Sequence, residues 1–385
     1  MSWSKVRLGD IADFSNGVNF NKAAYSEGIK LISVSNFGNH FYPNYKELSE
    51  IKEDAVRKGD YLVDGDIVFV RSNGNKDLVG RCMLIRNPAF PVTFSGFCIR
   101  VRLREQHKYD PVFFTYHFKE SGFRRAMAGT AVGANIQNLS QGRLNKYVLS
   151  VPDYKMQIRI ADTLSKYDSL IENNQKQIEL LEEAAQRLYK EWFVDLRFPG
   201  YEHKRIVDGI PEGWQKTKVG ALLGHVKRCT QIKTCDYQPS GKIPVIDQSR
   251  DFIAGFTDDE TALIDLNSAV ILFGDHTRIL KYILFPFAKG ADGTQIIISN
   301  NESMPQSLFY WSLKCINLSN YHYARHFKYL KEENILLPQK DIALKFASYV
   351  DPIMQKIQSS REVISNASAA RDLILPKLMN GEIEL

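Results

Sequence analysis

The chain has 385 residues, which is long for a single domain and sufficient for two domains that each bury a core. Hydrophobic residues make up 44% of the chain, charged residues 24% and aromatic residues 11%, and this composition excludes an intrinsically disordered protein. No apolar run reaches the roughly 20 residues of a membrane-spanning helix, and the N-terminus carries early charges, so we expect a cytoplasmic protein without a membrane partner.

The formal net charge of +6 is unevenly distributed. Residues 1–150 hold 21 Lys and Arg against 14 acids, a net of +7, whereas residues 151–212 hold 9 against 12, a net of −3. A basic excess is what a surface needs to neutralise phosphates, which favours nucleic-acid binding by the first region. A basic surface that contacts only solvent fits the charge equally well. The 5 cysteines form no CxxC pair, so we expect reduced thiols and no metal site.

In chain order, alternating and apolar segments bounded by turn residues predict short strands. In the first half, the expected strands are 61–63, 66–71 and 97–103. The last of these places Arg100, Arg102 and Arg104 on one face. A Phe-rich helix is expected over 111–125. In the second half, we expect strands over 269–273, 282–285 and 295–298, and a helix over 307–315. Each half therefore predicts a mixed α/β globule.

A long apolar ladder with alternating spacings of four and three follows each globule. The first runs from Ile160 to Trp192 and the second from Phe346 to Leu378, a constant offset of 186, because 346 − 160 = 378 − 192 = 186. The ladders predict two long helices, the first over about 153–192. Pro376 is expected to end the second helix early. The internal repeat indicates a chain built as two halves, each a globule followed by a helix.

Four heptads with polar flanks favour an antiparallel coiled coil between the two helices, although an ordinary core helix would show a similar ladder. The small polar residues Asn174 and Ser360 lie near the middle of their ladders and are expected to meet and fix the register. The expected seam consists of Ile160, Leu164, Ile171, Asn174, Ile178, Leu181, Val350, Ile353, Ile357, Ser360 and Ile364. The expected domains are 1–150, 213–337 and the helical spacers 151–212 and 338–385.

The sequence offers little for catalysis. It contains no phosphate-binding loop and no glycine-rich turn suited to a nucleotide or S-adenosylmethionine. Residues 87–90 (NPAF) only partly match the Asn-Pro-Pro-Phe loop of adenine methyltransferases, and we interpret them as a turn. Asp275 and His276 would point to opposite faces of a strand, so a contact role is favoured over an acid/base pair.

Several segments along the whole chain resemble the specificity subunit of type I restriction-modification systems. They are residues 151–152 with 157–161 (QIRIA), 160–165 (IADTLS), 186–193, 209–214 (GIPEGW), 290–294 (GADGT) and 374–383 (ILPKLMNGEI). The resemblance implies an α+β protein with two pseudo-symmetric α/β target recognition domains, separated by two long helices that form an antiparallel coiled coil. It also implies a subunit without catalysis of its own.

In that family, each globule reads one half of a split site in double-stranded DNA, and the helices set the gap between the halves. Two methyltransferase subunits dock on the helices and carry S-adenosylmethionine, so the resemblance implies no cofactor in this chain. Restriction subunits join them to form the nuclease. The alternative that we retain is a non-catalytic assembly scaffold whose two globules bind proteins, with an incidental basic excess.

Base edges are read mainly by Arg, Lys, Asn and Gln side chains on exposed segments. In the first globule, the expected DNA contacts are Arg71, Ser72, Asn73, Asn75, Lys76, Arg81, Gln137 and Asn138. A solvated hairpin and a capped connector would explain the same residues. In the second globule, the expected contacts are His276, Arg278, Lys281, Lys289, Asp292, Tyr323, Arg325, His326 and Lys328.

Overall fold

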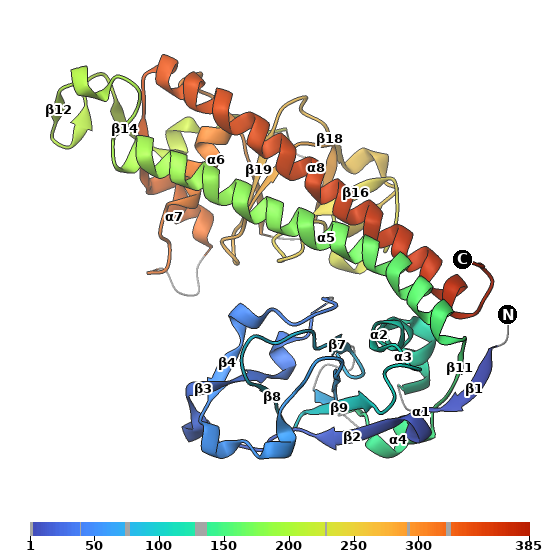
Figure 1. The fold of residues 1–385 in the computed structure, drawn as a ribbon. Helices are drawn as coiled ribbons and strands as arrows, with labels where there is room; N and C mark the ends of the chain where they lie inside the picture. The colour runs from blue at the N-terminus through green and yellow to red at the C-terminus, as the bar shows by residue number, and fades with distance from the viewer. Residues whose placement is uncertain are drawn as a thin grey trace. The chain divides into compact units, whose positions relative to one another are not determined.

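The computed structural model describes residues 3–38, 40–73, 78–127, 137–227, 229–290, 293–320 and 325–385. These residues form two compact units. Unit 1 comprises Met1–Glu172 and Ser365–Leu385, and unit 2 comprises Asn173–Ile364. Each unit contains one mixed α/β globule and one part of each of two long helices, α5 (Tyr154–Tyr189) and α8 (Lys340–Met379) (Figure 1).

The globule of unit 1 is built on a four-stranded antiparallel sheet in the order β2-β9-β5-β7. These strands are Ala12–Asn16, Cys98–Leu103, Ile67–Val70 and Cys82–Leu84. All four residues of β5 are buried, because β5 is an inner strand with core on both faces. A smaller sheet has the order β4 (Ser49–Ile51), β3 (Tyr25–Ile32) and β8 (Val92–Phe94). The expected strand at 61–63 was wrong, since these residues belong to no strand.

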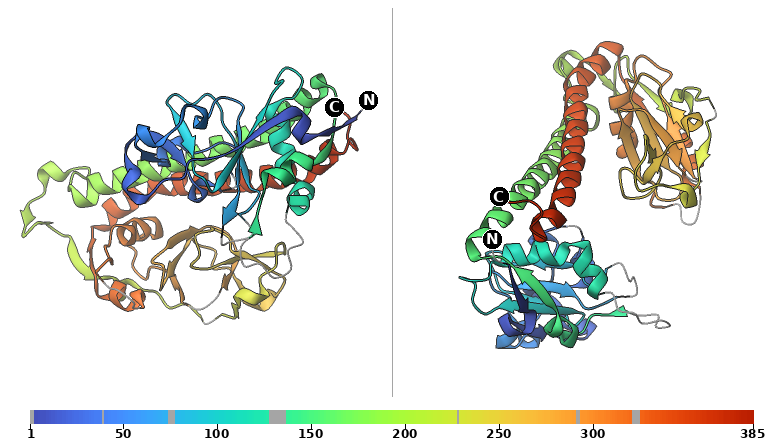
Figure 2. Two further views of the ribbon diagram at one scale, coloured as in Figure 1. Left: turned by 90° about the horizontal axis from the view of Figure 1, so that it is seen from below. Right: turned by 90° about the vertical axis from the view of Figure 1, so that its right-hand side faces the viewer.

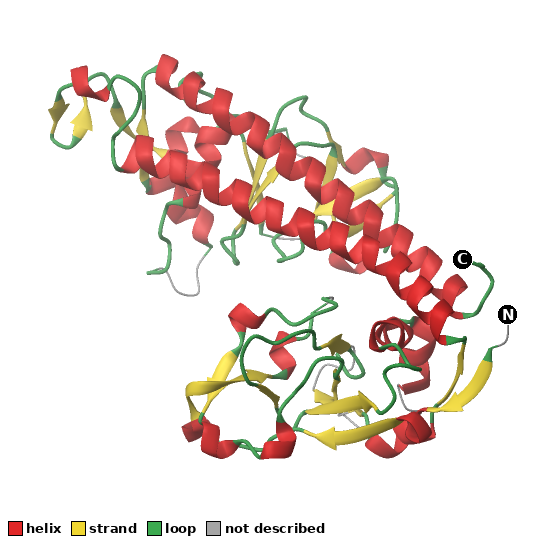
Figure 3. Ribbon diagram, in the orientation of Figure 1, coloured by secondary structure: helices red, strands yellow, loops and turns green. Residues whose placement is uncertain are grey.

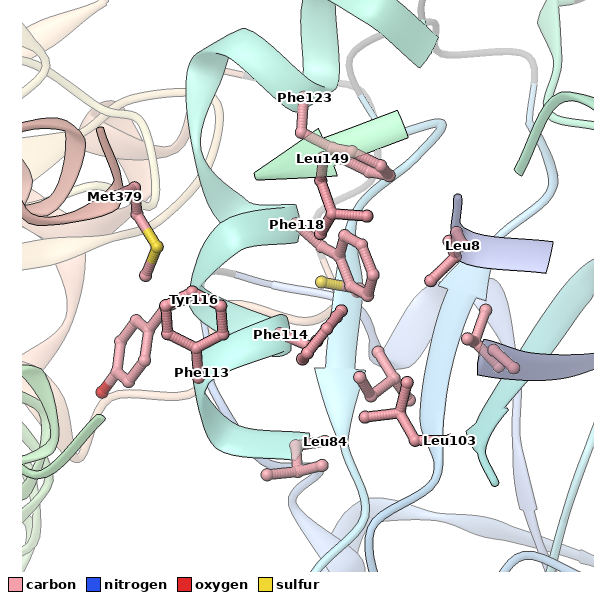
Figure 4. Packing of buried hydrophobic residues seen from close by; sticks show 14 of the residues in the cluster. Leu8, Leu84, Leu103, Phe113, Phe114, Tyr116, Phe118, Phe123, Leu149 and Met379 are labelled. Carbon is pink, nitrogen blue, oxygen red and sulfur yellow. The ribbon is translucent and has the colours of Figure 1, made fainter. Parts of the chain in front are cut away.

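The core of unit 1 is dominated by phenylalanines. The expected helix over 111–125 is two helices, α2 (Pro111–Lys119) and α3 (Ser121–Met127), since Glu120 between them is extended. Figure 4 shows Phe114 and Phe118 on the side of the sheet and Met379 of α8 on the opposite side of α2. The end of the second long helix is therefore part of the core of the first globule.

The globule of unit 2 repeats this plan. Its three-stranded sheet has the order β20-β19-β22, equivalent to β7-β5-β9. These strands are Leu280–Ile283, Val270–Gly274 and Thr294–Ile297, followed by α6 (Gln306–Lys314). The second sheet of this globule contains β15 (Gln231–Ile232), β21 (Phe287–Gly290), β16 (Ile243–Ile246), β17 (Gly255–Thr257) and β18 (Leu263–Ile264).

The duplication extends to the strands that precede the long helices. In unit 1, β1 (Ser4–Arg7) pairs with β11 (Val148–Val151), and in unit 2, β14 (Gln215–Lys218) pairs with β23 (Asn334–Leu337). The register is the same, because Ser4 faces Val151 and Gln215 faces Leu337. The helices begin at Tyr154 and Lys340, and 340 − 154 = 186 confirms the offset of the ladders.

The two long helices pair antiparallel, as the sequence predicted (Figures 2 and 3). In unit 1, Arg371 of α8 forms an ion pair with Asp168 of α5. In unit 2, Ser360 of α8 donates a hydrogen bond to Oε1 of Gln177 of α5 at 3.0 Å. Asn174 was the residue expected to face Ser360. The hydrogen bond instead goes to Gln177, which lies about one turn later in α5. Among the expected seam residues, Ile160 and Leu164 join the core of unit 1, and Val350 and Ile357 join that of unit 2.

Pro376 does not end the second helix early, which corrects the expectation. α8 continues to Met379, and Leu375, Leu378 and Met379 are buried. Proline removes one backbone donor, and burial of three apolar side chains in the last turn outweighs that loss.

Among the helices of the described residues, none combines the length and the apolar character of a membrane span.

Candidate nucleic-acid interface

Three distant segments of unit 1 meet where β5 ends. The backbone N–H of Arg71 donates to the carbonyl oxygen of Phe97 at 2.8 Å. The carbonyl oxygen of Arg71 accepts from the N–H of Leu139, also at 2.8 Å. We call Arg71, Phe97 and Leu139 the first junction.

Unit 2 contains the same arrangement where β19 ends. The N–H of Asp275 donates to the carbonyl oxygen of Gly293 at 2.6 Å, and the carbonyl oxygen of Asp275 accepts from the N–H of His326 at 2.9 Å. We call Asp275, Gly293 and His326 the second junction.

Strand register establishes that the two junctions are equivalent. Val70 faces Cys98 in unit 1, and Gly274 faces Thr294 in unit 2. In unit 1, Arg71 follows Val70 and Phe97 precedes Cys98. In unit 2, Asp275 follows Gly274 and Gly293 precedes Thr294 in the same way. The backbone frame is the same in both globules, whereas the side chains differ at all three positions.

The first junction brings together two segments that we predicted separately to contact DNA, one after β5 and one before Leu139. β6 (Ser72–Asn73) pairs antiparallel with β10 (Gln137–Asn138), so that Ser72 faces Asn138 and Asn73 faces Gln137. The side chain of Asn138 is exposed, and Nη1 of Arg71 donates to the carbonyl oxygen of Gly96 at 3.4 Å. Asn75 and Lys76 lie outside the described residues.

The second junction is built around a buried carboxylate. Oδ1 of Asp275 accepts from the N–H of Phe327 at 2.7 Å and so holds the start of α7 (His326–Glu332) against the turn after β19. Exposed side chains surround this point on both segments. They are His276 and Arg278 in the turn, and Arg325 and Lys328 at the start of α7. Asp292 and Tyr323 lie outside the described residues.

Comparisons with known proteins agree with this duplicated architecture. The family model described as type I restriction modification DNA specificity domain matches residues 1–183. The chain is 27% identical over 305 residues to the MjaIX specificity subunit of a type I restriction enzyme from Methanocaldococcus jannaschii. That alignment covers 71% of this chain and 69% of the relative. A putative MjaX specificity subunit of the same organism is 28% identical over 177 residues, which are 45% of this chain and 40% of the relative.

A solved structure supports the fold over both halves. The S subunit of a type I restriction-modification system from M. genitalium superimposes with a TM-score of 0.61 at 17% identity. The superposition covers 98% of this chain and 96% of that one. Residues 1–183 therefore match the type I DNA specificity domain family, and the chain has the fold of an S subunit over both halves.

Two of the expected DNA contacts are inside the fold, and we assign them structural roles instead. Lys281 of β20 is 4% exposed, and its Nζ donates to the carbonyl oxygens of Asp251 at 2.5 Å and Phe252 at 3.3 Å. Burial lowers the pKa of Lys281 to about 8. His326 is 6% exposed, and its Nδ1 lies 2.8 Å from the carbonyl oxygen of Asp275.

Two further candidate DNA contacts lie away from the junctions. Half-buried Arg81 precedes β7 and lines a cavity with Tyr116 of α2 and Arg371 of α8. Lys289 belongs to β21, in the second sheet of its globule, and burial lowers its pKa. Neither residue belongs to the β6–β10 ladder, the turn after β19 or the start of α7.

The three arginines of β9 and its end are also occupied within the fold. Arg102 makes a bidentate ion pair with the buried carboxylate of Asp66, at 2.6 and 2.7 Å. Nη1 of Arg100 donates to the carbonyl oxygen of Gly59 at 2.9 Å, and Arg104 pairs with Asp13. Arg100 and Arg102 therefore hold the loop before β5, the latter through a strong bidentate charge-assisted pair, and Arg104 pairs with β2.

Sequence reasoning missed two residues at the junctions. Phe97, expected as the first residue of a strand, lies in the turn before β9, and its side chain is 64% exposed. Gln248 follows β16 and accepts from the N–H of His276 through Oε1 at 3.0 Å. The Ser95-Gly96 dipeptide was the available signal for the turn at Phe97.

In the part of the chain that is described, no group of His, Cys, Asp or Glu is arranged to hold a metal ion.

Proposed function

We propose that this chain selects the DNA target of a type I methyltransferase complex, with each globule reading one half of a split sequence. The observation that carries the proposal is the pair of equivalent junctions. Their backbone frames coincide, but the exposed side chains around them differ: Phe97 and Asn138 at the first junction, and His276, Arg278 and Arg325 at the second. A constant scaffold with different side chains suits two sites that read different bases.

We further propose that the methylation chemistry belongs to partner subunits. Two methyltransferase subunits, one for each half of the duplicated chain, would bind the helices and carry S-adenosylmethionine. Restriction subunits would join that complex to cleave DNA. This chain would contribute recognition and spacing and no catalytic group.

Modified-base sequencing at single-nucleotide resolution tests the proposal. Genomic DNA is compared between host cells that express the partner methyltransferase with this chain and cells that express the methyltransferase alone. We expect a split motif of methylated adenines that depends on the chain. An unchanged methylation pattern, together with DNA binding that is weak, salt-insensitive and independent of sequence, would support the assembly scaffold instead.

Two substitutions serve as controls for each other. Arg71→Ala removes a cation at the first junction, and Arg278→Ala removes one beside the second. Loss of one base contact weakens binding by about 1–3 kcal/mol. We therefore expect each variant of the complex to lose discrimination at one half-site and to retain it at the other, as measured with duplexes mutated in either half. Equal losses at both half-sites would contradict the assignment of one half-site to each globule.

A further inference from the structure

We propose that Phe97 contacts the methyl group of a thymine in the first half-site, and that the second globule makes no equivalent contact. This inference rests on the proposed function, since it names the chemistry by which one globule reads its DNA. It follows from the exposure of Phe97, the rigidity of its turn, its polar neighbours and the identity of the equivalent residue in unit 2.

The turn that carries Phe97 is held by backbone hydrogen bonds from several sides. Within the turn, the N–H of Cys98 donates to the carbonyl oxygen of Ser95 at 2.9 Å. The N–H of Gly96 donates to the carbonyl oxygen of Val18, before the turn in sequence, at 2.7 Å. The carbonyl oxygen of Phe97 accepts from Arg71 at 2.8 Å and from Ser72 at 3.4 Å. A phenyl group on a fixed backbone has only two side-chain torsions to restrict, so little conformational entropy is lost when it contacts a ligand.

The side chain of Phe97 is nevertheless left 64% exposed. Within the described residues, no aromatic ring or cation stacks on it. Phe90, at the opposite end of β8, provides a contrast because it packs edge-on against Tyr45 with ring centroids 5.7 Å apart and is 37% exposed. A single exposed apolar residue needs no explanation by itself. Phe97, however, is an exposed ring on a rigid turn at the point where both proposed reading segments meet.

The neighbours of Phe97 are polar. The guanidinium of Arg71 donates to Gly96, the residue before Phe97, and the Ser72–Asn138 pair follows directly on the same strand. In the major groove, guanidinium and amide groups can pair with the heteroatoms of the bases, and the one apolar group on any base edge is the thymine methyl. A phenyl ring among such polar side chains therefore matches a thymine flanked by bases that form hydrogen bonds.

The equivalent position in unit 2 has no side chain and no room for one. Gly293 has a φ of +81°, which an L side chain rarely adopts. A Cβ atom at Gly293 would lie 2.7 Å from the ring of His276 and 2.9 Å from Nε2 of Gln248. Polar side chains thus occupy the space that the first atom of a side chain at Gly293 would need. The thymine-methyl contact is therefore expected in one half-site only.

The test uses the complex of the full chain with its methyltransferase partner and duplexes that carry its methylated motif. Uracil replaces thymine at one position at a time, which removes only the methyl group. In wild type, one replacement in the first half-site should weaken binding about fourfold, the effect of exposing one methyl group. Phe97→Ala should bind the thymine duplex about as weakly as wild type binds that uracil duplex, and should not distinguish the two.

Two variants complete the design. Phe97→Leu, which keeps an apolar side chain, should retain part of the preference for thymine over uracil. Phe90→Ala, a matched loss of a phenyl group at the other end of β8, should retain all of it. Uracil in the second half-site should affect wild type and Phe97→Ala equally. Thermal unfolding of Phe97→Ala should match that of wild type, since the ring contributes little to the core.

Several results would overturn the inference. One is a first half-site that contains no A·T pair. Another is Phe97→Ala with the same affinity and the same sensitivity to uracil as wild type. A third is an equal loss on thymine and uracil duplexes, which would indicate a ring inserted between base pairs or a disturbed turn. If wild type itself shows no sequence preference, the proposed function fails, and this outcome is distinct from the other three.

Discussion

At the residue scale, buried polar groups predict how unit 1 responds to pH. His117 of α2 is 8% exposed, and its Nε2 lies 3.0 Å from the hydroxyl oxygen of Tyr147. Burial disfavours the charged imidazolium and lowers the pKa of His117 to about 4. The folded chain therefore keeps this histidine neutral over a pH range in which the unfolded chain protonates it.

The consequence is a loss of stability in acid. The unfolded state takes up a proton near pH 6.5 and the folded state only near pH 4, so this contribution is complete above pH 6.5 and is lost as the pH falls toward 4. The expected loss in the free energy of unfolding is about 3 kcal/mol at most. Denaturant unfolding at pH 7.5 and 4.5 should show a smaller difference for His117→Phe than for wild type.

The control is His107→Gln, since the side chain of His107 is 74% exposed. This variant should keep the full pH difference of wild type. A His117→Phe protein with an unchanged pH difference would show that other groups determine the acid response.

The candidate site was only partly predictable, because side-chain types are visible in a sequence but their surroundings are not. Arg71, Ser72 and Asn138 could be selected as a dense set of hydrogen-bond donors, and they do lie together. Lys281 has the same chemistry, yet its ammonium binds carbonyls some 30 residues away. Phe97 could not be selected, since its exposure depends on the long-range bonds of its turn, from Arg71 to Phe97 and from Gly96 to Val18. Whether these residues contact DNA stays a prediction.

At the scale of elements, the two halves differ in chemistry at one rung of the helix pair. In unit 1, the carboxylate of Asp168 is bound by Arg371 and by the hydroxyl of Tyr116. The offset of 186 places Met354 and Ala185 at the equivalent positions of unit 2, and both are buried. One half therefore has a charged pair where the other has apolar packing.

This difference predicts an ordered series of stabilities. Arg371→Ala leaves a buried carboxylate without its cation, and such a loss typically costs about 3–5 kcal/mol. The double variant Asp168→Met with Arg371→Ala copies the residues of unit 2 and should recover much of that loss. Denaturant unfolding of the single and double variants measures both effects. A double variant less stable than Arg371→Ala would show that the pair is not replaceable by apolar packing.

The helices themselves were the most predictable elements. A ladder of more than 30 residues averages over local exceptions, so the period and the offset survive the polar rungs. Pro376 misled the prediction because its effect depends on tertiary packing, here the burial of Leu375, Leu378 and Met379. The break at Glu120 was missed for a similar reason, since two short helices and one longer helix share the same Phe-rich pattern.

At the scale of the whole molecule, the division between the compact units falls inside both long helices. It lies between Glu172 and Asn173 in α5 and between Ile364 and Ser365 in α8. Each unit therefore contains its own ion pairs and apolar contacts between the helices, such as Asp168 with Arg371 in unit 1. An insertion at both division points would lengthen the helices and leave the contacts within each unit in place.

If the helices set the gap between the half-sites, such an insertion should widen the gap. Four residues add about 6 Å to a helix, which is close to two base-pair steps of about 3.4 Å. They also advance the helix by about 400°, so the apolar faces return to within about 40° of their original direction. We therefore expect a variant with four residues inserted at both points to methylate a motif with unchanged half-sites and a gap wider by about one or two base pairs.

A matched insertion elsewhere separates the length of the helices from the length of the chain. The turn at Asp208 and Gly209 joins the short strands β12 (Ile206–Val207) and β13 (Ile210–Pro211). Four residues inserted in that turn extend neither α5 nor α8, so the gap should stay as in wild type. The same gap in all three proteins would exclude the helices as the element that sets it. Changed half-sites would indicate instead that the insertion had disturbed a globule, because each half-site depends on side chains within one unit.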